Sequence, residues 1–174
     1  EFVSANPTGP MHVGHCRGAV FGDVLSNLLK FNGNKVTKEF YINDYGNQIY
    51  NFAKSVFLRL REIKFSEEFP DNNDDLYTGE YVKDIAKNIL KQKRNIKIDN
   101  FKKDFNLIKK VSLKYSLDSI KSDLKLLNIK HDYFFSESQL VNKNLVLKNI
   151  NKLKKNNFVV DGYLDPPKGE DSSD

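Results

Sequence analysis

EFVSANPTGPMHVGHCRG, residues 1–18, is the stretch of this 174-residue chain that decides the fold. The apolar start at 1–4 predicts a short buried strand, and the Pro- and Gly-rich residues 5–10 predict a tight loop after it. A helix is then expected from about residue 13 to 31, closed by Asn-Gly-Asn at 32–34. Its apolar side chains recur at helical spacing, at Val20, Val24, Leu25 and Leu28. The stretch thus brings a strand end, a loop and a helix N-terminus to one point.

The next residues continue the order strand, helix, strand, helix. A second strand is expected at 36–42, and a second helix follows Asn43 and Asp44 and extends through residue 60. This order is typical of an α/β protein with a doubly wound parallel sheet, of which two strands make only the first half. Phe40 and Ile42 are therefore expected on a sheet face that missing strands leave exposed.

Beyond residue 62 the chain becomes acidic and then mostly helical. The remaining expected elements are helices at 81–94, 100–128 and 139–156, a strand at 131–135 and a hairpin at 158–164. Between residues 87 and 155, 18 Lys and Arg stand against 6 Asp and Glu. A basic half of this kind favours contact with nucleic acid, or it is a set of solvated helix faces in a Lys-rich chain.

Composition excludes several classes of protein. Hydrophobic residues make up 39% of the chain and charged residues 29%, so the chain can build a core and stay in solution. No apolar run approaches the roughly 20 residues that span a bilayer. The first residues lack the basic start and apolar middle of a signal peptide, and one cysteine forms no internal disulfide. We therefore expect a cytoplasmic protein without a membrane partner.

The helix start near residue 13 suits an anion. Unpaired N–H groups and partial positive charge at a helix N-terminus favour phosphates, and His12 and His15 are spaced to lie on one side of the first turn. A Walker-type loop fails, because His15 and Cys16 stand where Lys and Ser or Thr are required. A metal site made of both histidines and Cys16 lacks a fourth ligand cluster, and a helix start with two surface histidines is the remaining alternative.

Longer motifs surround this histidine pair. HVGH at 12–15 resembles the HIGH signature of class I aminoacyl-tRNA synthetases, and ANPTGPMHVGH at 5–15 resembles its extended form in the arginyl-tRNA synthetases. The likeness continues in RGA at 17–19, Gly22-Asp23, FYINDYGNQ at 40–48 and DYFFSES at 132–138. It covers nearly the whole chain and implies the N-terminal part of a catalytic domain with a Rossmann-like, HIGH-type sheet.

The resemblance implies a role for several residues. His12 and His15 match the catalytic histidines that contact ATP and stabilise its α-phosphate, and Asn6 matches the asparagine that holds the α-group of the amino acid. Glu1 stands where the family pairs an acid with the guanidinium of arginine. The ATP-binding set is Thr8, Gly9, His12, Gly14 and His15. Asp44, Tyr45 and Gln48 follow the second strand, beside the point where such sheets bind ligands, so we add them to the arginine-binding set of Glu1 and Asn6.

The sequence therefore predicts an arginine–tRNA ligase that activates arginine with ATP and transfers it to tRNA. ATP with Mg²⁺ is expected as a substrate, with no tightly bound cofactor, no metal site, and a monomer as the favoured state. Residues 1–62 are expected to form the first βαβα half of the catalytic domain, and 63–174 an incomplete connecting insertion. The KMSKS-like loop and the rest of the arginine pocket would lie downstream, so the truncated chain alone is expected to be inactive. Another HIGH-type nucleotidyltransferase and an RNA-binding module remain as alternatives.

Overall fold

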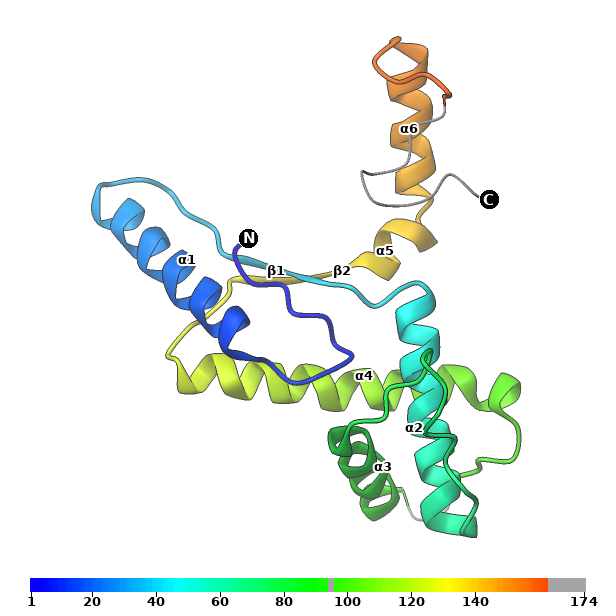
Figure 1. The fold of residues 1–174 in the computed structure, drawn as a ribbon. Helices are drawn as coiled ribbons and strands as arrows, with labels where there is room; N and C mark the ends of the chain where they lie inside the picture. The colour runs from blue at the N-terminus through cyan, green and yellow to red at the C-terminus, as the bar shows by residue number, and fades with distance from the viewer. Residues whose placement is uncertain (94–95, 163–174) are drawn as a thin grey trace. The chain divides into compact units, whose positions relative to one another are not determined.

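A computed structural model describes residues 1–93 and 96–162 of the chain. It divides into two compact units, Glu1–Ser138 and Gln139–Asp174, and each is described by itself. In chain order the elements are α1 (Val13–Phe31), β1 (Glu39–Ile42), α2 (Asn47–Phe65), α3 (Glu80–Gln92), α4 (Phe101–Leu126), β2 (Tyr133–Ser136), α5 (Glu137–Asn142) and α6 (Leu145–Lys155) (Figure 1).

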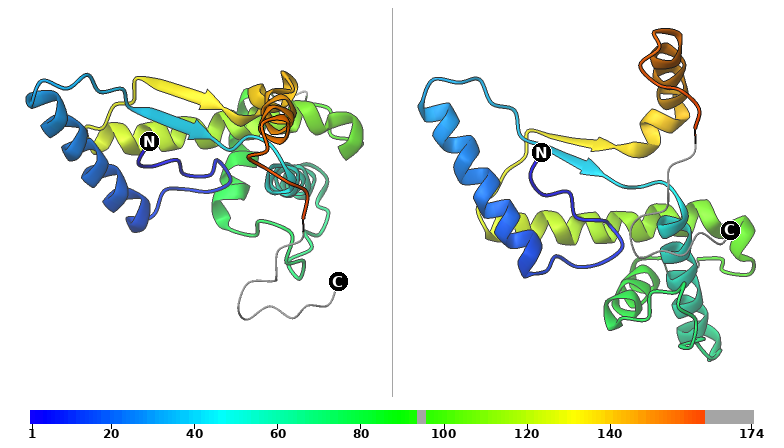
Figure 2. Two further views of the ribbon diagram at one scale, coloured as in Figure 1. Left: turned by 90° about the horizontal axis from the view of Figure 1, so that it is seen from above. Right: turned by 45° about the horizontal axis from the view of Figure 1, so that its top comes forward.

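The sheet of the first unit consists of β1 and β2, which pair in parallel (Figure 2). Glu39 lies opposite Tyr133, and Ile42 lies opposite Ser136. Three helices, α2, α3 and α4, form the connection between the two strands. The strands expected near 36–42 and 131–135 are thus confirmed in shortened form, and they are each other's partners.

The strand expected at 1–4 is not formed in the part of the chain that the structure describes. This prediction was wrong, because a hydrogen bond to a side chain takes the place of backbone pairing between strands. The Oγ of Ser4 accepts the backbone N–H of Tyr41 at 3.0 Å, so the segment is tied to β1 without backbone pairing. Val3 and Ala5 are nevertheless buried, so the segment still contributes to the core.

Helix α1 begins and ends as predicted, but it packs differently. Gly33 stops the helix with a positive φ of 82°, a backbone conformation that glycine adopts without strain. The face that packs inward carries small residues, Ala19, Gly22 and Ser26. A Cβ on Gly22 would lie 2.1 Å from Cγ of Phe2, so the Phe2 ring fills the space that this glycine leaves. The predicted apolar positions are exposed instead: Val20, Val24, Leu25 and Leu28.

Two clusters of buried side chains hold the first unit together, and the long helix α4 contributes to both (Figure 1). One lies among α2, α3 and the N-terminal half of α4, where Ile108 is buried. The other joins the N-terminal segment, β1 and the C-terminal half of α4. Phe40 and Ile42 belong to this second cluster, so the expectation that they would be exposed was wrong: Ile120 and Leu124 of α4 cover them.

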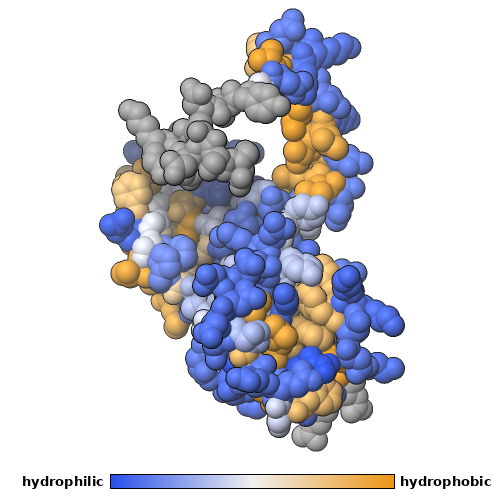
Figure 3. Space-filling view, turned by 45° about the vertical axis from the view of Figure 1, so that its right-hand side comes forward, coloured by the Kyte–Doolittle hydropathy of each residue, from blue (hydrophilic) through white to orange (hydrophobic). Residues whose placement is uncertain are grey.

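The second unit contains α6 and most of α5, and the described residues 156–162 after α6 are not helical. The single helix expected at 139–156 is broken at Asn144, whose φ of 52° lies in the left-handed region, and this break separates α5 from α6. Apolar side chains gather along one side of α6 while its lysines lie elsewhere (Figure 3). A hairpin was expected at 158–164, but residues 158–162 form no strand, and residues 163 and 164 lie outside the described residues. Residue 94, the last of the third predicted helix, also lies outside the described residues.

No helix in the described ranges is long and apolar enough to cross a membrane.

Candidate active site

The two histidines at the start of α1 cap the helix together. His12 occupies the N-cap position, and its Nδ1 accepts the backbone N–H of Gly14 at 3.1 Å. In return, Nδ1 of His15 accepts the backbone N–H of His12 at 3.3 Å. The two rings stack with their centroids 3.7 Å apart. Because both Nδ1 atoms are acceptors, each neutral ring carries its proton on Nε2, and the pair offers two N–H donors beside the helix N-terminus.

The charge state of His15 follows from its surroundings. Burial lowers the pKa of His15, and the neighbouring His12 lowers this pKa further because two positive rings would repel each other. His15 is therefore neutral at pH 7 and acts as a hydrogen-bond donor through Nε2–H.

Gly14 lies close to the ring of His12. A Cβ at this position would lie 3.0 Å from Cε1 and 3.1 Å from Nδ1 of His12, which is closer than the ring tolerates without shifting. Gly14 was predicted to contact ATP, and in the structure it also contacts the His12 ring. A methyl group at residue 14 would require the imidazole that caps α1 to shift by a few tenths of an ångström.

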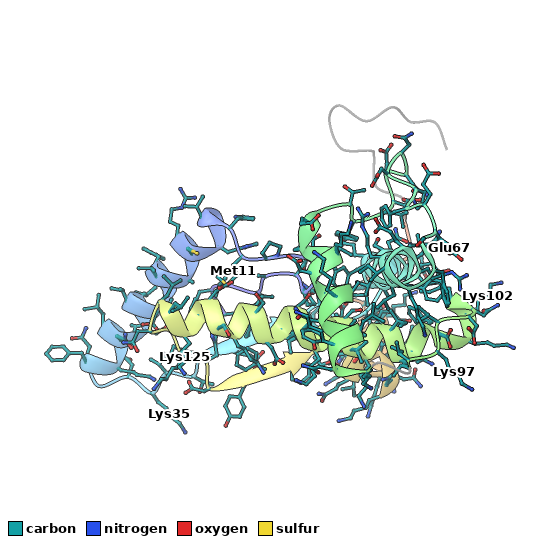
Figure 4. All side chains as sticks on the ribbon, turned by 90° about the horizontal axis from the view of Figure 1, so that it is seen from below. Met11, Lys35, Glu67, Lys97, Lys102 and Lys125 are labelled. Carbon is teal, nitrogen blue, oxygen red and sulfur yellow. The ribbon has the colours of Figure 1, made fainter. Side chains whose placement is uncertain are left out.

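The loop before α1 is held in place by burial and by a hydrogen bond from α3. Pro7 and Thr8 are buried, and the carbonyl oxygen of Thr8 accepts the hydroxyl of Tyr81, on α3, at 2.8 Å. Gly9 follows at the surface edge with the Tyr81 ring in ordinary contact range. Met11 packs against the second cluster, on the side of α4 (Figure 4). The two ATP-binding candidates of the loop, Thr8 and Gly9, thus both contact Tyr81 of α3.

Side-chain amide hydrogen bonds join Asn6 and Gln48, two residues of the predicted arginine-binding set, to the neighbouring Asn43. Asn43 donates from Nδ2 to Oδ1 of Asn6 at 2.7 Å, and Asn6 donates from Nδ2 to Oε1 of Gln48 at 3.3 Å. The structure therefore brings together Asn6 and Gln48, which are 42 residues apart in the sequence. Asn43 was not among the predicted site residues, although it lies within the motif FYINDYGNQ at 40–48.

Asp44 is already engaged within the chain. Its Oδ1 accepts the backbone N–H of Ser138 at 2.8 Å, and its Oδ2 accepts the hydroxyls of Ser138, at 2.8 Å, and Ser136. Burial raises the pKa of the Asp44 carboxyl, but the hydrogen bonds from Ser136 and Ser138 and the charge of Lys109 outweigh burial and leave this pKa below its ordinary value. The carboxylate therefore ties the end of β1 to the end of β2.

Glu1 and Tyr45 are not brought into a network. Both side chains are exposed, and neither makes a hydrogen bond within residues 1–93 and 96–162. Their roles in binding arginine stay predictions. Over the same ranges, no three His, Cys, Asp or Glu side chains come together in a way that would hold a metal ion.

The chain matches a known protein family over most of its length. The family described as class I tRNA synthetases (R), catalytic domain, matches residues 1–163. The arginine–tRNA ligase of Pelagibacter ubique is 55% identical over 171 residues, which cover 98% of this chain and 30% of that protein. The corresponding ligase of Bartonella bacilliformis is 47% identical over 178 residues, which cover 100% of this chain and 30% of that protein.

A solved structure shares the fold. The crystal structure described as an arginyl-tRNA synthetase from Campylobacter jejuni superimposes with a TM-score of 0.76 at 35% identity, over 88% of this chain and 34% of that one. The chain thus spans about 30% of the length of the curated relatives that it matches.

Proposed function

Since the chain belongs to the family of class I tRNA synthetase (R) catalytic domains, we propose that it supplies the ATP-binding part of an arginine–tRNA ligase. The reaction is the attack of an arginine carboxylate oxygen on the α-phosphorus of ATP, with Mg²⁺ as part of the ATP substrate. The bond to pyrophosphate breaks, and the arginyl group then passes from the adenylate to a ribose hydroxyl at the 3′ end of tRNA. The protein would act in the cytoplasm, as a monomer, without a tightly bound cofactor.

The stacked pair of His12 and His15 is the observation that carries the proposal. Negative charge grows on the non-bridging oxygens of the α-phosphate as the carboxylate attacks. Two Nε2–H donors and the positive end of α1 stabilise that charge without having to reorganise. Because the Nδ1 atoms are held by backbone N–H groups, the donor direction of each ring is fixed before ATP arrives.

The amide chain provides the second half of the proposal. Asn6 holds the α-group of arginine, and Asn43 fixes which end of the Asn6 amide faces the substrate. Gln48 accepts from Asn6 through Oε1, so its own NH₂ group remains a donor toward the same space. Glu1 would pair with the guanidinium, since a carboxylate binds this planar cation through two parallel hydrogen bonds. Tyr45 would lie at the rim, and Asp44 would contribute through the strand ends that it joins.

In this proposal β1 and β2 are strands of a larger, doubly wound sheet. The boundary between residues 62 and 63 would mark the start of the family's connecting insertion. Arginine, ATP and tRNA are the proposed partners, and the Lys-rich half of the chain is available to the phosphates of the tRNA.

The test is arginine-dependent ATP–pyrophosphate exchange in a family-length protein. In a chimaera, this chain replaces the 171-residue matching segment of the Pelagibacter ubique ligase. We expect exchange with arginine tRNA present, and a loss of about 10²–10³ or more in the His12→Ala/His15→Ala double variant, as for other oxyanion donors. The matched control is Asp118→Ala, which changes an exposed side chain on α4. A correctly folded chimaera without exchange, beside an active parent ligase, would refute the proposal.

A further inference from the structure

Tyr81 joins two parts of the molecule that lie far apart in the sequence. Its hydroxyl donates to the carbonyl oxygen of Thr8 at 2.8 Å, across a separation of 73 residues. Tyr81 is on α3, in the region expected to be an insertion, whereas Thr8 lies in the loop that leads to His12. Because Thr8 is buried, its carbonyl group would lose solvation without gaining a partner if this bond were absent.

The ring of Tyr81 is held in one place. It packs against the cluster formed by α2, α3 and α4. A Cβ at Gly79 would lie 2.5 Å from Cε1 of this ring, so the tyrosine occupies space that only a glycine leaves free. On the other side, the ring approaches Gly9, where an added Cβ would be 3.7 Å from the hydroxyl oxygen. Burial raises the pKa of Tyr81 to about 12, with a smaller contribution from Tyr77, so the hydroxyl remains a donor at every physiological pH.

The hydrogen bond between Tyr81 and Thr8 fixes the start of the short segment that leads from Thr8 to His12. Pro7 is fully buried and fixes the loop at its start. Four residues after Thr8, the chain reaches His12, whose ring direction depends on the backbone of the first turn of α1. A shift of the Thr8 carbonyl therefore moves the turn at 9–11 and, with it, the donors that face the ATP phosphates.

We propose that Tyr81 is a positioning residue for the ATP site, through its hydrogen bond to Thr8 and its contact with the loop. Tyr81 does not touch the reacting atoms. It couples α3 to the loop, so the packing of the inserted helices sets the place of the histidine donors. This inference rests on the proposed function, because it assigns the donors to ATP.

Tyr81→Phe tests the proposal, and the chain offers a matched control. Tyr115 is a second partly buried tyrosine, which lines the same cavity as Gly9 and Tyr81. Its hydroxyl donates to the backbone carbonyl of Asn88, at 3.2 Å, and not to the loop. In the chimaera, Tyr81→Phe should lower kcat/KM for ATP about three- to tenfold, the loss expected of one neutral hydrogen bond, with the KM for arginine unchanged. Tyr115→Phe should lower Tm by about as much as Tyr81→Phe does. It should leave kcat/KM for ATP and the KM for arginine unchanged.

Gly79→Ala provides a second route to the same end, because the new methyl group displaces the Tyr81 ring. It should lower kcat/KM for ATP at least as much as Tyr81→Phe. Equal kinetics for Tyr81→Phe and Tyr115→Phe would overturn the proposal, as would equal losses for ATP and arginine.

A direct measurement keeps the two proposals separate. In the 174-residue chain, amide hydrogen exchange of residues 9–14 should be about three- to tenfold faster in Tyr81→Phe than in Tyr115→Phe. If the unmutated chimaera lacks exchange of pyrophosphate, the proposed function fails while this measurement still decides the coupling. Unchanged protection of residues 9–14 in Tyr81→Phe would refute the coupling, whatever the activity.

Discussion

Replacement of Asp44 by alanine should destabilise the fold more than it harms arginine binding. The substitution removes three hydrogen-bond acceptor contacts, which involve the hydroxyl of Ser136 and both the hydroxyl and the N–H of Ser138. These contacts join the ends of β1 and β2, and the carboxylate also lies at the start of α5, where negative charge is favourable.

The size of the effect follows from this geometry. A hydrogen bond to a charged group contributes about 1.5–3 kcal/mol, but neighbouring bonds are not additive and this site is only partly buried, so water replaces some of the contacts. We expect the free energy of unfolding to fall by about 2–4 kcal/mol. Asp118→Ala is the control, since this exposed carboxylate pairs with Lys114 at 2.8 Å on one helix face and should contribute at most about 0.5 kcal/mol.

Urea denaturation of the chain, followed by far-ultraviolet circular dichroism, measures both values. The pH dependence gives a second check. The folded-state pKa of Asp44 lies below its unfolded value of 3.8, so its contribution is present above that pH and is lost as pH falls through the folded pKa. A loss no larger than that of Asp118→Ala would refute this role. A rise in the KM for arginine at unchanged stability would instead restore Asp44 to the arginine site.

Four further outcomes are expected. In the chimaera, His15→Ala should lower the rate of arginyl-adenylate formation about 10²–10³-fold, measured before the steady state, and a change confined to the KM for arginine would contradict this. Glu1→Gln should raise the KM for arginine about tenfold with little change for ATP, because one charge-assisted pair is lost; equal damage to both substrates would make Glu1 structural. Burial, and then the charge of nearby Lys38, lower the pKa of His131. The free energy of unfolding should therefore have its full value above pH 6.5 and fall as the pH drops below 6.5 toward the folded pKa. His131→Phe should remove this pH dependence in urea titrations at pH 5 and 7. Gly22→Ala should cost about 1–3 kcal/mol of unfolding free energy, because its methyl group meets Phe2, and a neutral result would show that the ring moves freely.

Local signals in the sequence predicted local structure well. The start of α1 at His12 and its stop at Gly33 depend on residues within one turn, and both are where the sequence placed them. The third and fourth expected helices match α3 and α4 to within two residues at each end, because their apolar periodicity extends over several turns. The histidine pair was recognised for the same reason, since its two members are only three residues apart.

Features that depend on distant partners were not predicted. Ser4 satisfies the N–H of Tyr41 with a side chain, which no local pattern distinguishes from a strand. The contacts of Asn43 and Tyr81 join segments 37 and 73 residues apart, and a polar or aromatic residue gives no sign of such a partner by its own type. The apolar stripe of α1 was a correct helix signal but a wrong burial signal, because glycine and alanine make the closest contact instead.

Helix α4 explains why the site cannot be understood from the first 62 residues alone. Ile120 and Leu124 cover Phe40 and Ile42, so removal of α4 would return those side chains to water. Each such side chain contributes about 1.5–3 kcal/mol when it is fully buried. The same helix packs against α2 and α3 and, through α3, supports the Tyr81 contact with the loop before α1. A boundary at residue 62 can therefore mark where the family inserts sequence, but the residues after it complete the core on which the histidine pair and the amide chain are built.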